Sequence, residues 1–301
     1  MFRNVAAFAR AASDEGKHWI SSYRKALSAS ATVSGQWFDY SYAGGNPIPN
    51  YYASSPLEAA QLERDKGIIM PRIGPDERLW LHRWTAMSAA ASATSTTNAN
   101  QSLYLMDYLL YYPFVDLDAA GEEQAFDNAV GLDRYTNGVG VQIMAVAQAP
   151  TVGGGTYTVK FIDTDNVERT TTTVYCPAAQ PSGALCSSVV AAAGISPFLP
   201  LPAGVKGVKR LVSATVGVAN GGLMALVLVK PIDMAYAREE CRRPTSSPTE
   251  SYGDVWEMER IRQRAGSVRI EPNAFLGWIG QGIAGSLASA PLVGMIESFW
   301  E

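Results

Sequence analysis

The strongest run of apolar residues lies between residues 211 and 229, where the pattern predicts two strands. Residues 223–229, Leu-Met-Ala-Leu-Val-Leu-Val, are apolar at every position, as is typical of a strand buried on both faces. Residues 211–218 alternate valine with small or polar residues. Between the two runs, Asn220-Gly221-Gly222 offers residues that readily adopt the positive φ of a tight turn. The pattern predicts a β-hairpin whose second strand lies deep in the core.

Shorter β-branched and aromatic runs along the rest of the chain predict further strands. They cover residues 79–84, 103–112, 139–148, 156–162, 167–176 and 268–279. The runs at 156–162 and 167–176 are separated by Asp163-Thr-Asp165-Asn166, which predicts a second hairpin. About eight to ten short strands with little helix predict a mainly β fold, a β-sandwich or a jelly-roll-like arrangement with short helices and long loops.

Helical patterns are confined to two short parts of the chain. In residues 1–28, apolar positions recur at helical spacing, which predicts a helix or an N-terminal arm. Ser55-Pro56-Leu57-Glu58 has the features of a helix start, and Gly67 follows as a stop, so a short helix is expected up to about Lys66. We expect residues 29–301 to form a single β-sandwich domain, with extended loops near 86–101 and 235–255.

Composition narrows the function classes. Only 17% of the 301 residues are charged and the net charge is −4, so no basic field would attract nucleic acid. Arg3 and Arg10 interrupt the N-terminus, which leaves no apolar segment typical of a secretory signal. The three cysteines, Cys176, Cys186 and Cys241, show no zinc-ligand spacing, and we expect free thiols.

The sequence Gly280-Gln-Gly282-Ile-Ala-Gly285 matches the glycine spacing of a dinucleotide-binding turn. That motif requires a βαβ unit and an acidic residue about 20 positions later, and the sequence ends at Glu301. We therefore expect a glycine-rich turn between packed strands. Residues 274–300 are apolar, but their glycines and Pro291 favour buried strand and loop over a membrane helix. Glu168 and Val174 replace the expected glycine and glutamate of a calcium loop that would begin at Asp163.

The acidic residues and the histidines are the remaining candidates for reactive sites. The acidic residues Asp116, Asp118, Glu122 and Glu123 could supply the acid and base of a glycosidase, although exposed loop acids are the simpler interpretation. His18 and His82 are the only histidines, which excludes a site of three or more histidines. His82 lies in Leu79-Trp-Leu-His-Arg-Trp84 and is expected to be packed. No catalytic, cofactor-binding or metal-binding residues are predicted, and we expect a protein that is not an enzyme and needs no cofactor.

Five segments resemble a family of virion structural proteins of tailed bacteriophages, over roughly residues 35 to 300. They are Gly44-Gly-Asn-Pro-Ile-Pro-Asn-Tyr-Tyr52, Asp107-Tyr-Leu-Leu-Tyr-Tyr-Pro-Phe-Val-Asp116, Arg134-Tyr-Thr-Asn-Gly-Val-Gly-Val141, Pro197-Phe-Leu-Pro-Leu201 and Leu226-Val-Leu-Val-Lys-Pro231. The resemblance implies a β-sandwich protein of the particle, a capsid decoration or cement protein. The chain differs from many members of that family in having a longer N-terminal arm.

The resemblance implies binding to the major capsid protein and other virion proteins, on a capsid surface assembled in the host cytoplasm. We also expect a homo-oligomer, for which a trimer is one arrangement, and arms at 1–28 and 235–255 that become ordered on neighbouring subunits. Neither nucleic acid nor membrane is an expected partner. A tail or baseplate component that binds glycan or a receptor, and a glycan-cleaving enzyme using Asp116 or Asp118, remain alternatives.

Overall fold

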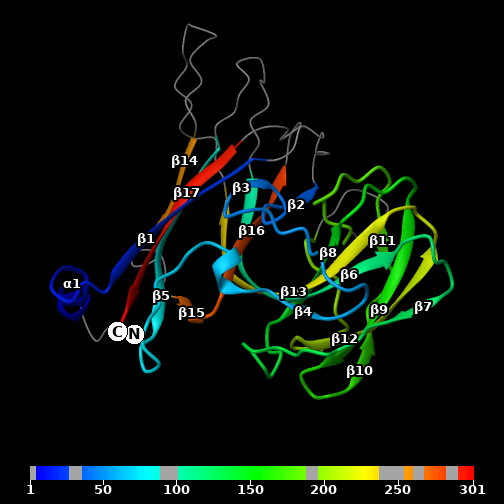
Figure 1. Cartoon of the computed structure of the whole chain (residues 1–301), viewed down its shortest axis with the longest axis horizontal. Helices are drawn as coiled ribbons and strands as arrows, with labels where there is room; N and C mark the ends of the chain where they lie inside the picture. The colour runs from blue at the N-terminus through cyan, green and yellow to red at the C-terminus, as the bar shows by residue number, and fades with distance from the viewer. Residues whose placement is uncertain are drawn as a thin grey trace, which may run out of the picture.

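The computed structural model describes residues 5–26, 36–88, 101–187, 196–236, 254–259, 268–282 and 291–301. This part of the chain is mainly β, as predicted, with one α-helix and three antiparallel sheets that pack in the manner of a sandwich (Figure 1). It contains seventeen strands, more than the eight to ten expected, because seven of them are only two or three residues long. Such short strands give too little alternation to be found from sequence.

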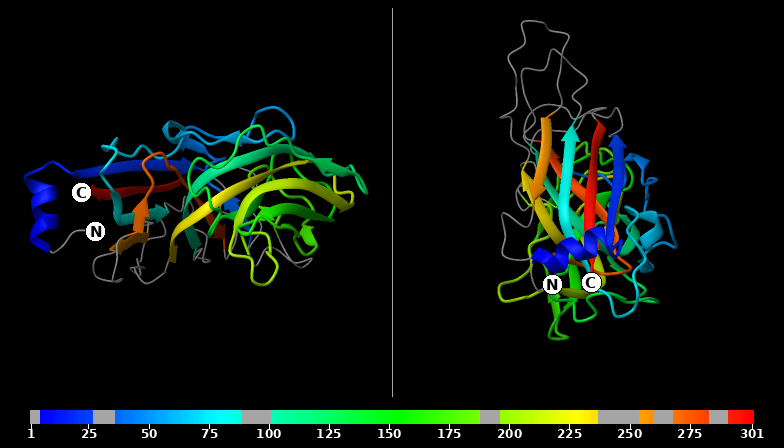
Figure 2. Two further views of the ribbon diagram at one scale, coloured as in Figure 1. Left: turned by 90° about the horizontal axis from the view of Figure 1, so that it is seen from below. Right: turned by 90° about the vertical axis from the view of Figure 1, so that its left-hand side faces the viewer.

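The terminal sheet contains the first and last strands of the chain. Its order is β14-β5-β17-β1-β3, and β15 also pairs with β5. The bounds are β1 His18–Ala26, β3 Gly44–Asn46, β5 Leu79–Ser88, β14 Asp254–Glu259, β15 Val268–Ile270 and β17 Pro291–Trp300. Helix α1, Val5–Ser13, lies across the ends of these strands (Figure 2).

The central sheet has the order β2-β16-β6-β13-β8, with β4 paired to β6. Its strands are β2 Trp37–Asp39, β4 Ala60–Gln61, β6 Gln101–Asp116, β8 Gln142–Ala147, β13 Leu223–Tyr236 and β16 Phe275–Gly282. The distal sheet has the order β10-β9-β12-β7, with β11 paired to β9. It comprises β7 Glu123–Ala125, β9 Gly155–Asp163, β10 Glu168–Thr170, β11 Val174–Cys176 and β12 Val208–Val218.

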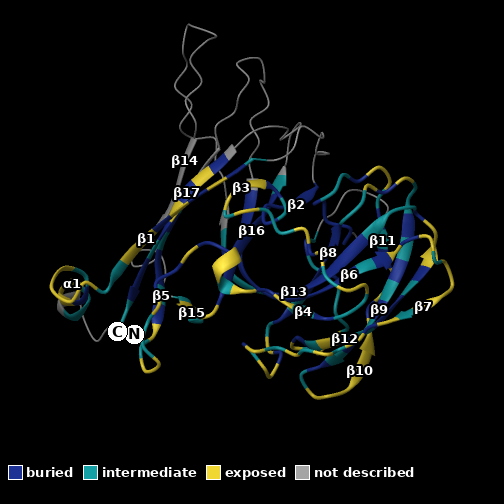
Figure 3. Cartoon of the chain, viewed as in Figure 1, coloured by how far each residue is buried: buried dark blue, intermediate teal, exposed yellow. Residues whose placement is uncertain are grey.

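The long strands β6 and β13 connect two hydrophobic cores. Near the start of β6, Leu103 and Leu105 pack with residues of the terminal sheet such as Leu81. Near its end, Leu110 packs with distal-sheet residues such as Phe161. Figure 3 shows the two strands as a nearly continuous buried band through the middle of the molecule. Because strand β6 contributes to both cores, the three sheets form one packed unit.

The predicted hairpin at 211–229 is wrong, although both of its strands exist. Strand β12 pairs with β9 and β7, whereas β13 pairs with β6 and β8, so the two lie in different sheets. They face each other across the core instead, as Leu211 and Leu226 do. The turn itself keeps the expected conformation, with φ of 70° at Gly221 and 100° at Gly222. Positive φ permits a tight turn but does not decide whether the strands pair or form an arch.

The helix predicted between Ser55 and Lys66 is also absent. In its place are turns, the two-residue strand β4 and a 3₁₀ turn at Arg64–Lys66 that ends at Gly67. The backbone N–H of Ala59 donates to Asp127 O at 2.7 Å and that of Leu62 donates to Leu109 O at 3.1 Å. Backbone pairing with neighbouring segments thus replaces the local helical bonds, as tertiary context often overrides local propensity.

Within the described residues of segment 1–28, only Val5–Ser13 form an α-helix. Residues 18–26, which were expected to continue a helix or an arm, form β1 and pair along their whole length with β17. Tyr23 is fully buried and donates to Thr85 O at 2.7 Å. Opposite it stands Gly294, where a Cβ atom would collide with the Tyr23 ring and with Thr85 O. Residues 237–253, most of the predicted loop at 235–255, and 89–100 lie outside the described residues.

Leu226 tests the two-sided burial of β13. The residue is 0% exposed, so Leu226→Ala should lower the free energy of unfolding by about 2–5 kcal/mol, through lost transfer energy and a cavity. Val152→Ala is the matched control because Val152 is 79% exposed, and its change should stay within about 0.5 kcal/mol. Urea unfolding followed by circular dichroism measures both. A soluble, well-folded Leu226→Asp protein would contradict the buried position.

Candidate functional site

A cluster of buried polar residues lies in the central sheet beside the terminal sheet. Asp39 of β2 is fully buried, and its carboxylate accepts hydrogen bonds from four donors. Tyr108 Oη donates at 2.7 Å, Ser41 N at 2.9 Å and Ser41 Oγ at 2.8 Å, and Tyr52 Oη is the fourth donor. Burial raises the pKa of Asp39, while these hydrogen bonds oppose the shift. The donor groups of Ser41, Tyr52 and Tyr108 thus replace water around the buried carboxylate.

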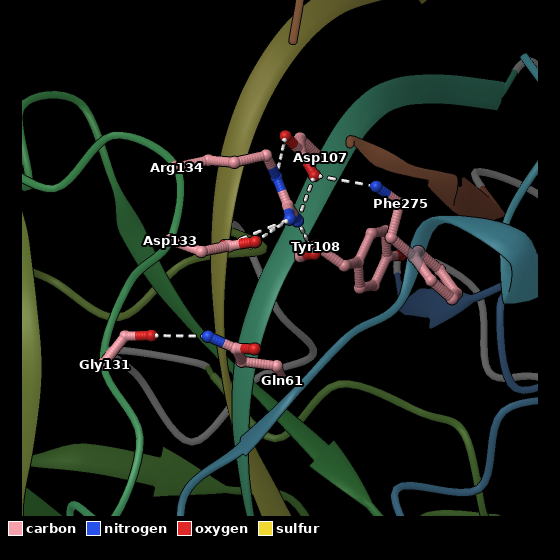
Figure 4. Close-up of polar contacts among 7 residues, drawn as sticks. All are labelled: Gln61, Asp107, Tyr108, Gly131, Asp133, Arg134 and Phe275. Atoms are coloured by element: carbon pink, nitrogen blue, oxygen red, sulfur yellow. Dashed lines mark hydrogen bonds and ion pairs between the residues drawn. The ribbon is translucent and has the colours of Figure 1, made fainter. Parts of the chain in front are cut away.

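The residue before Tyr108 is a second buried carboxylate. Arg134 forms a bidentate pair with Asp107, with Nε to Oδ2 at 3.0 Å and Nη2 to Oδ1 at 2.9 Å (Figure 4). The N–H of Phe275 donates to Asp107 Oδ1 at 3.0 Å, and Arg134 Nη2 also donates to Tyr108 O at 2.9 Å. Burial raises the pKa of Asp107 to about 7, and the Arg134 cation acts in the opposite direction. The fork geometry favours the charged pair.

Local contacts hold the loop that carries Arg134. Asp133 accepts from Arg134 Nη1 at 2.9 Å, and Gln61 Nε2 of β4 donates to Gly131 O at 3.0 Å (Figure 4). Residues from β6, β16 and this loop therefore meet at one buried ion pair, and β4 holds the same loop through Gly131. The sequence spacing gave no indication that Arg134 and Asp107 are partners.

Lys25 of β1 is the fourth buried acidic or basic residue of the cluster. Its Nζ donates to the carbonyls of Ala43 at 3.0 Å, Ile48 at 3.4 Å and Ser41 at 3.5 Å, and the side chain is 1% exposed. Burial lowers the pKa of Lys25 to about 8, and the negative charge of Asp39 opposes the shift. A small pocket adjoins the amine, lined by Lys25, Ser41, Pro47, Lys66, Phe275 and Trp278, among others.

The buried polar cluster is suited to holding the fold together. The Lys25 amine has three carbonyl acceptors, and both oxygens of Asp39 and of Asp107 accept hydrogen bonds from the protein. A general acid or base has to reach its substrate, directly or through one water. These groups instead direct their hydrogen bonds to backbone and side chains that connect strands distant in sequence.

The four acidic residues that could serve glycoside cleavage are exposed, and three of them bind groups in their own loop, in the turn at Gly221 or on strand β9. Asp116 Oδ1 accepts from Asp118 N at 2.8 Å, and Asp118 Oδ1 accepts from Gly221 N at 2.9 Å. Glu123 binds Lys160 Nζ at 2.7 Å, and the hydrogen bond from Lys160 lowers its pKa. A glycosidase acid needs a raised pKa, so the geometry around Glu123 favours a structural role. Glu122 is exposed in the same loop.

The two histidines come together, which the sequence did not predict. His18 Nε2 lies 2.7 Å from Glu297 Oε1, and His82 Nε2 lies 3.9 Å from Glu297 Oε2. The Phe299 ring stacks on His18 at 4.5 Å and meets His82 edge-on at 5.0 Å, and Phe8 of α1 covers the group. His82 is therefore packed, as predicted. The pairing of β5, β17 and β1 brings these residues together, and no local motif signals it.

The glycine motif, the turn at 163–166 and the cysteines all contribute to packing or to local structure. Gly280 and Gly282 lie within β16 and not in a turn, and a Cβ at Gly280 would collide with Tyr40. The predicted turn at 163–166 joins β9 and β10, and Asp163 Oδ1 accepts from the backbone N–H groups of Asp165 and Val167 at 2.8 and 2.9 Å. Cys176 and Cys186 are free and buried, and Cys241 lies outside the described residues.

Within the described ranges, no three His, Cys, Asp or Glu residues lie in a group that could hold a metal ion. No helix in this part of the chain is long and apolar enough to cross a membrane. Comparisons with family models, with curated proteins and with solved structures each find no match.

Removing Arg134 tests the buried ion pair. Arg134→Met leaves Asp107 buried without its cation, so the free energy of unfolding should fall by about 3–5 kcal/mol near pH 8. The loss should shrink toward pH 5, because a carboxyl with a raised pKa destabilises the fold when ionised and ceases to do so once protonated. Urea unfolding at both pH values measures the effect.

A second substitution and an exposed pair provide the controls for Arg134. Adding Asp107→Asn removes the unpaired charge and keeps an acceptor for Phe275 N, so the double variant should be more stable than Arg134→Met alone. Arg72→Met breaks an exposed pair with Asp65 and should cost only about 0–1 kcal/mol. Equal losses for Arg134→Met and Arg72→Met would contradict the importance of the buried pair.

Lys25 should make stability depend on pH in the alkaline range. Because its pKa is lowered to about 8 in the folded protein, the charged amine opposes folding below that pH, and the cost disappears as the pH rises toward 10.5. The difference in unfolding free energy between the natural protein and Lys25→Met should therefore increase by about 2 kcal/mol from pH 7.5 to 9.5. Lys206→Met, at an exposed position outside the pocket next to Lys25, is the control.

Proposed function

We propose that the chain is a non-enzymatic structural protein of the virion of a tailed bacteriophage. In this proposal it decorates the capsid surface, binds the major capsid protein and stabilises the shell. The low fraction of charged residues supports a role in protein contact, because the centres of protein interfaces are depleted in charge. The mainly β fold is compatible with the β-sandwich that the family resemblance implies.

The observation that carries the proposal is the meeting of the five resembling segments around β6. Arg134 of the third segment binds Asp107 of the second, and Leu226 of the fifth pairs with Tyr112. Further contacts join the remaining segments to this region: the ring of Tyr52 lies 5.4 Å from that of Tyr111, Lys230 Nζ donates to Val139 O at 2.8 Å, and the ring of Phe198 lies 5.7 Å from that of Tyr104. Segments far apart in sequence thus build one scaffold, as expected if their resemblance reflects a common fold.

The buried charges and most of the loop acids are engaged in structural contacts, which also supports a role in binding other proteins. The buried charges Lys25, Asp39, Asp107 and Arg134 are engaged in stabilising the sheets, and Asp116, Asp118 and Glu123 connect loops. The residues that the glycan-cleaving alternative would require thus have structural partners. Loops around a firmly packed scaffold are a common site for binding other proteins.

Binding to capsid shells tests the proposed function. Purified chain mixed with shells that lack it should pellet with them and raise the temperature at which they release their contents, because binding only the intact shell stabilises it. Isolated tails are the control particles. Co-sedimentation with tails alone, or a label at the tail in immuno-gold micrographs, would favour the tail or baseplate alternative and contradict capsid decoration.

A role of the N-terminal arm in capsid binding has to be tested with a deletion that spares strand β1. Removing residues 1–28 would remove β1 from the terminal sheet, so a loss of binding would reflect misfolding. Deleting residues 2–13 leaves β1 in place. Unchanged occupancy of the shells by this shorter chain would contradict a role of the first residues in capsid contact.

A further inference from the structure

One edge of the terminal sheet exposes an unusual amount of apolar surface. Five of the eleven large hydrophobic residues exposed in the described part of the chain lie on β1, on its neighbour β17 or in the adjoining loop. They are Trp19, Ile20, Ile69, Val293 and Met295, which we call the β1 patch. Their exposed fractions are 43%, 55%, 63%, 36% and 49%, respectively.

The register of the strands makes the β1 patch continuous. Ile20 lies opposite Glu297, Ser22 opposite Met295 and Arg24 opposite Val293, so Ile20 and Met295 are diagonal neighbours on the outer face. On the other side of the strand, Trp19 Nε1 donates to Ser21 Oγ at 2.9 Å, and Ser21 Oγ donates to Ile69 O. Apolar side chains therefore flank the strand on both faces.

The edge between these side chains has no strand partner among the described residues. Strand β1 pairs with β17 on one side, and on the other side β3 pairs only with Arg24, Lys25 and Ala26. Residues 18–23 contain no lysine, no proline and no bulge, which are common protections of an edge strand, and the loop at Ile69 contacts them at Ser21. Such an edge is a template for another strand.

We propose that the β1 edge pairs with the β1 edge of a second copy of the chain, in antiparallel register about a two-fold axis at Ile20. This register places Ile20 opposite Ile20, Trp19 opposite Ser21 and His18 opposite Ser22, and each pair shares one face of the joined sheet. It stops before Arg24, where β3 begins. The pairing defines one interface of the self-association included in the proposed function.

Charge favours a second copy over a foreign strand. The register brings no Lys, Arg, Asp or Glu opposite another charge, because residues 18–22 contain none. The nearest carboxylate, Glu297, already binds His18 and Arg83, with Arg83 Nε 3.6 Å from Oε2. Self-pairing therefore buries the apolar side chains of the edge without burying an unpaired charge.

Sedimentation of the full chain at increasing concentration tests the pairing. The natural protein should form a dimer, and Ile20→Lys should weaken it by at least about tenfold, because two lysines would meet at the axis. Val152→Lys, at an exposed position in a loop, is the control and should leave the dimer intact. Circular dichroism confirms that both variants fold.

Cross-linking tests the register. In the proposed dimer two Ile20→Cys side chains face each other, with Cβ atoms about 4.5–5.5 Å apart, so a short bis-maleimide should join the copies efficiently. Val152→Cys and the natural protein, which retains its own cysteines, are the controls. A monomer at every concentration, a dimer unaffected by Ile20→Lys, or equal cross-linking of Ile20→Cys and Val152→Cys would overturn the proposal. Capsid binding that persists in the Ile20→Lys monomer would leave the proposed function standing.

Discussion

The structure depends on the pairing of β6 with β13, because this pair is buried on both faces. Leu110 and Leu228 belong to the core shared with the distal sheet. Met106 and Val229 belong to a third buried cluster, on the other face of the central sheet. A strand buried in this way has no solvent face to which a charged side chain can turn. Asp107 lies in the middle of β6, so its charge has to be paired inside the protein. The loop of Arg134 and the start of β16 are fixed where they can supply that pairing.

The same constraint explains which parts of the fold could be predicted. An uninterrupted apolar run such as 223–229, which contains β-branched residues and is preceded by a turn, predicts a buried strand, and this prediction is confirmed. Its partners could not be predicted, because a strand needs neighbours on two edges as well as two faces, and β6 and β8 fill the edges. The turn at Gly221 and Gly222 fits a hairpin and an arch equally well. Pairing over long distances in sequence decided between them, and no local pattern records it.

The polar cluster was hidden for a related reason. Lys25, Asp39, Asp107 and Arg134 are single residues in four separate segments, with no repeated spacing between them. One signal was present: an aspartate within the apolar run 103–112 of a predicted buried strand requires a cation nearby. Identifying that cation as Arg134 required the structure. His18 and His82 gave no signal of this kind, since the first was expected in a helix and only β1 brings it to Glu297.

Scaffold and contact surface are separate parts of this chain. The five segments on which the proposed function rests begin at Gly44 and contact one another around the buried strand β6. The β1 patch includes Trp19 and Ile20, which precede that region, and it lies at an edge that the buried cluster reaches only through Lys25. Substitutions of exposed residues at the edge can therefore change what the protein contacts while the Asp107–Arg134 pair keeps the sheets together. Under the proposed pairing, the interior therefore specifies the scaffold, and the β1 edge specifies the partner.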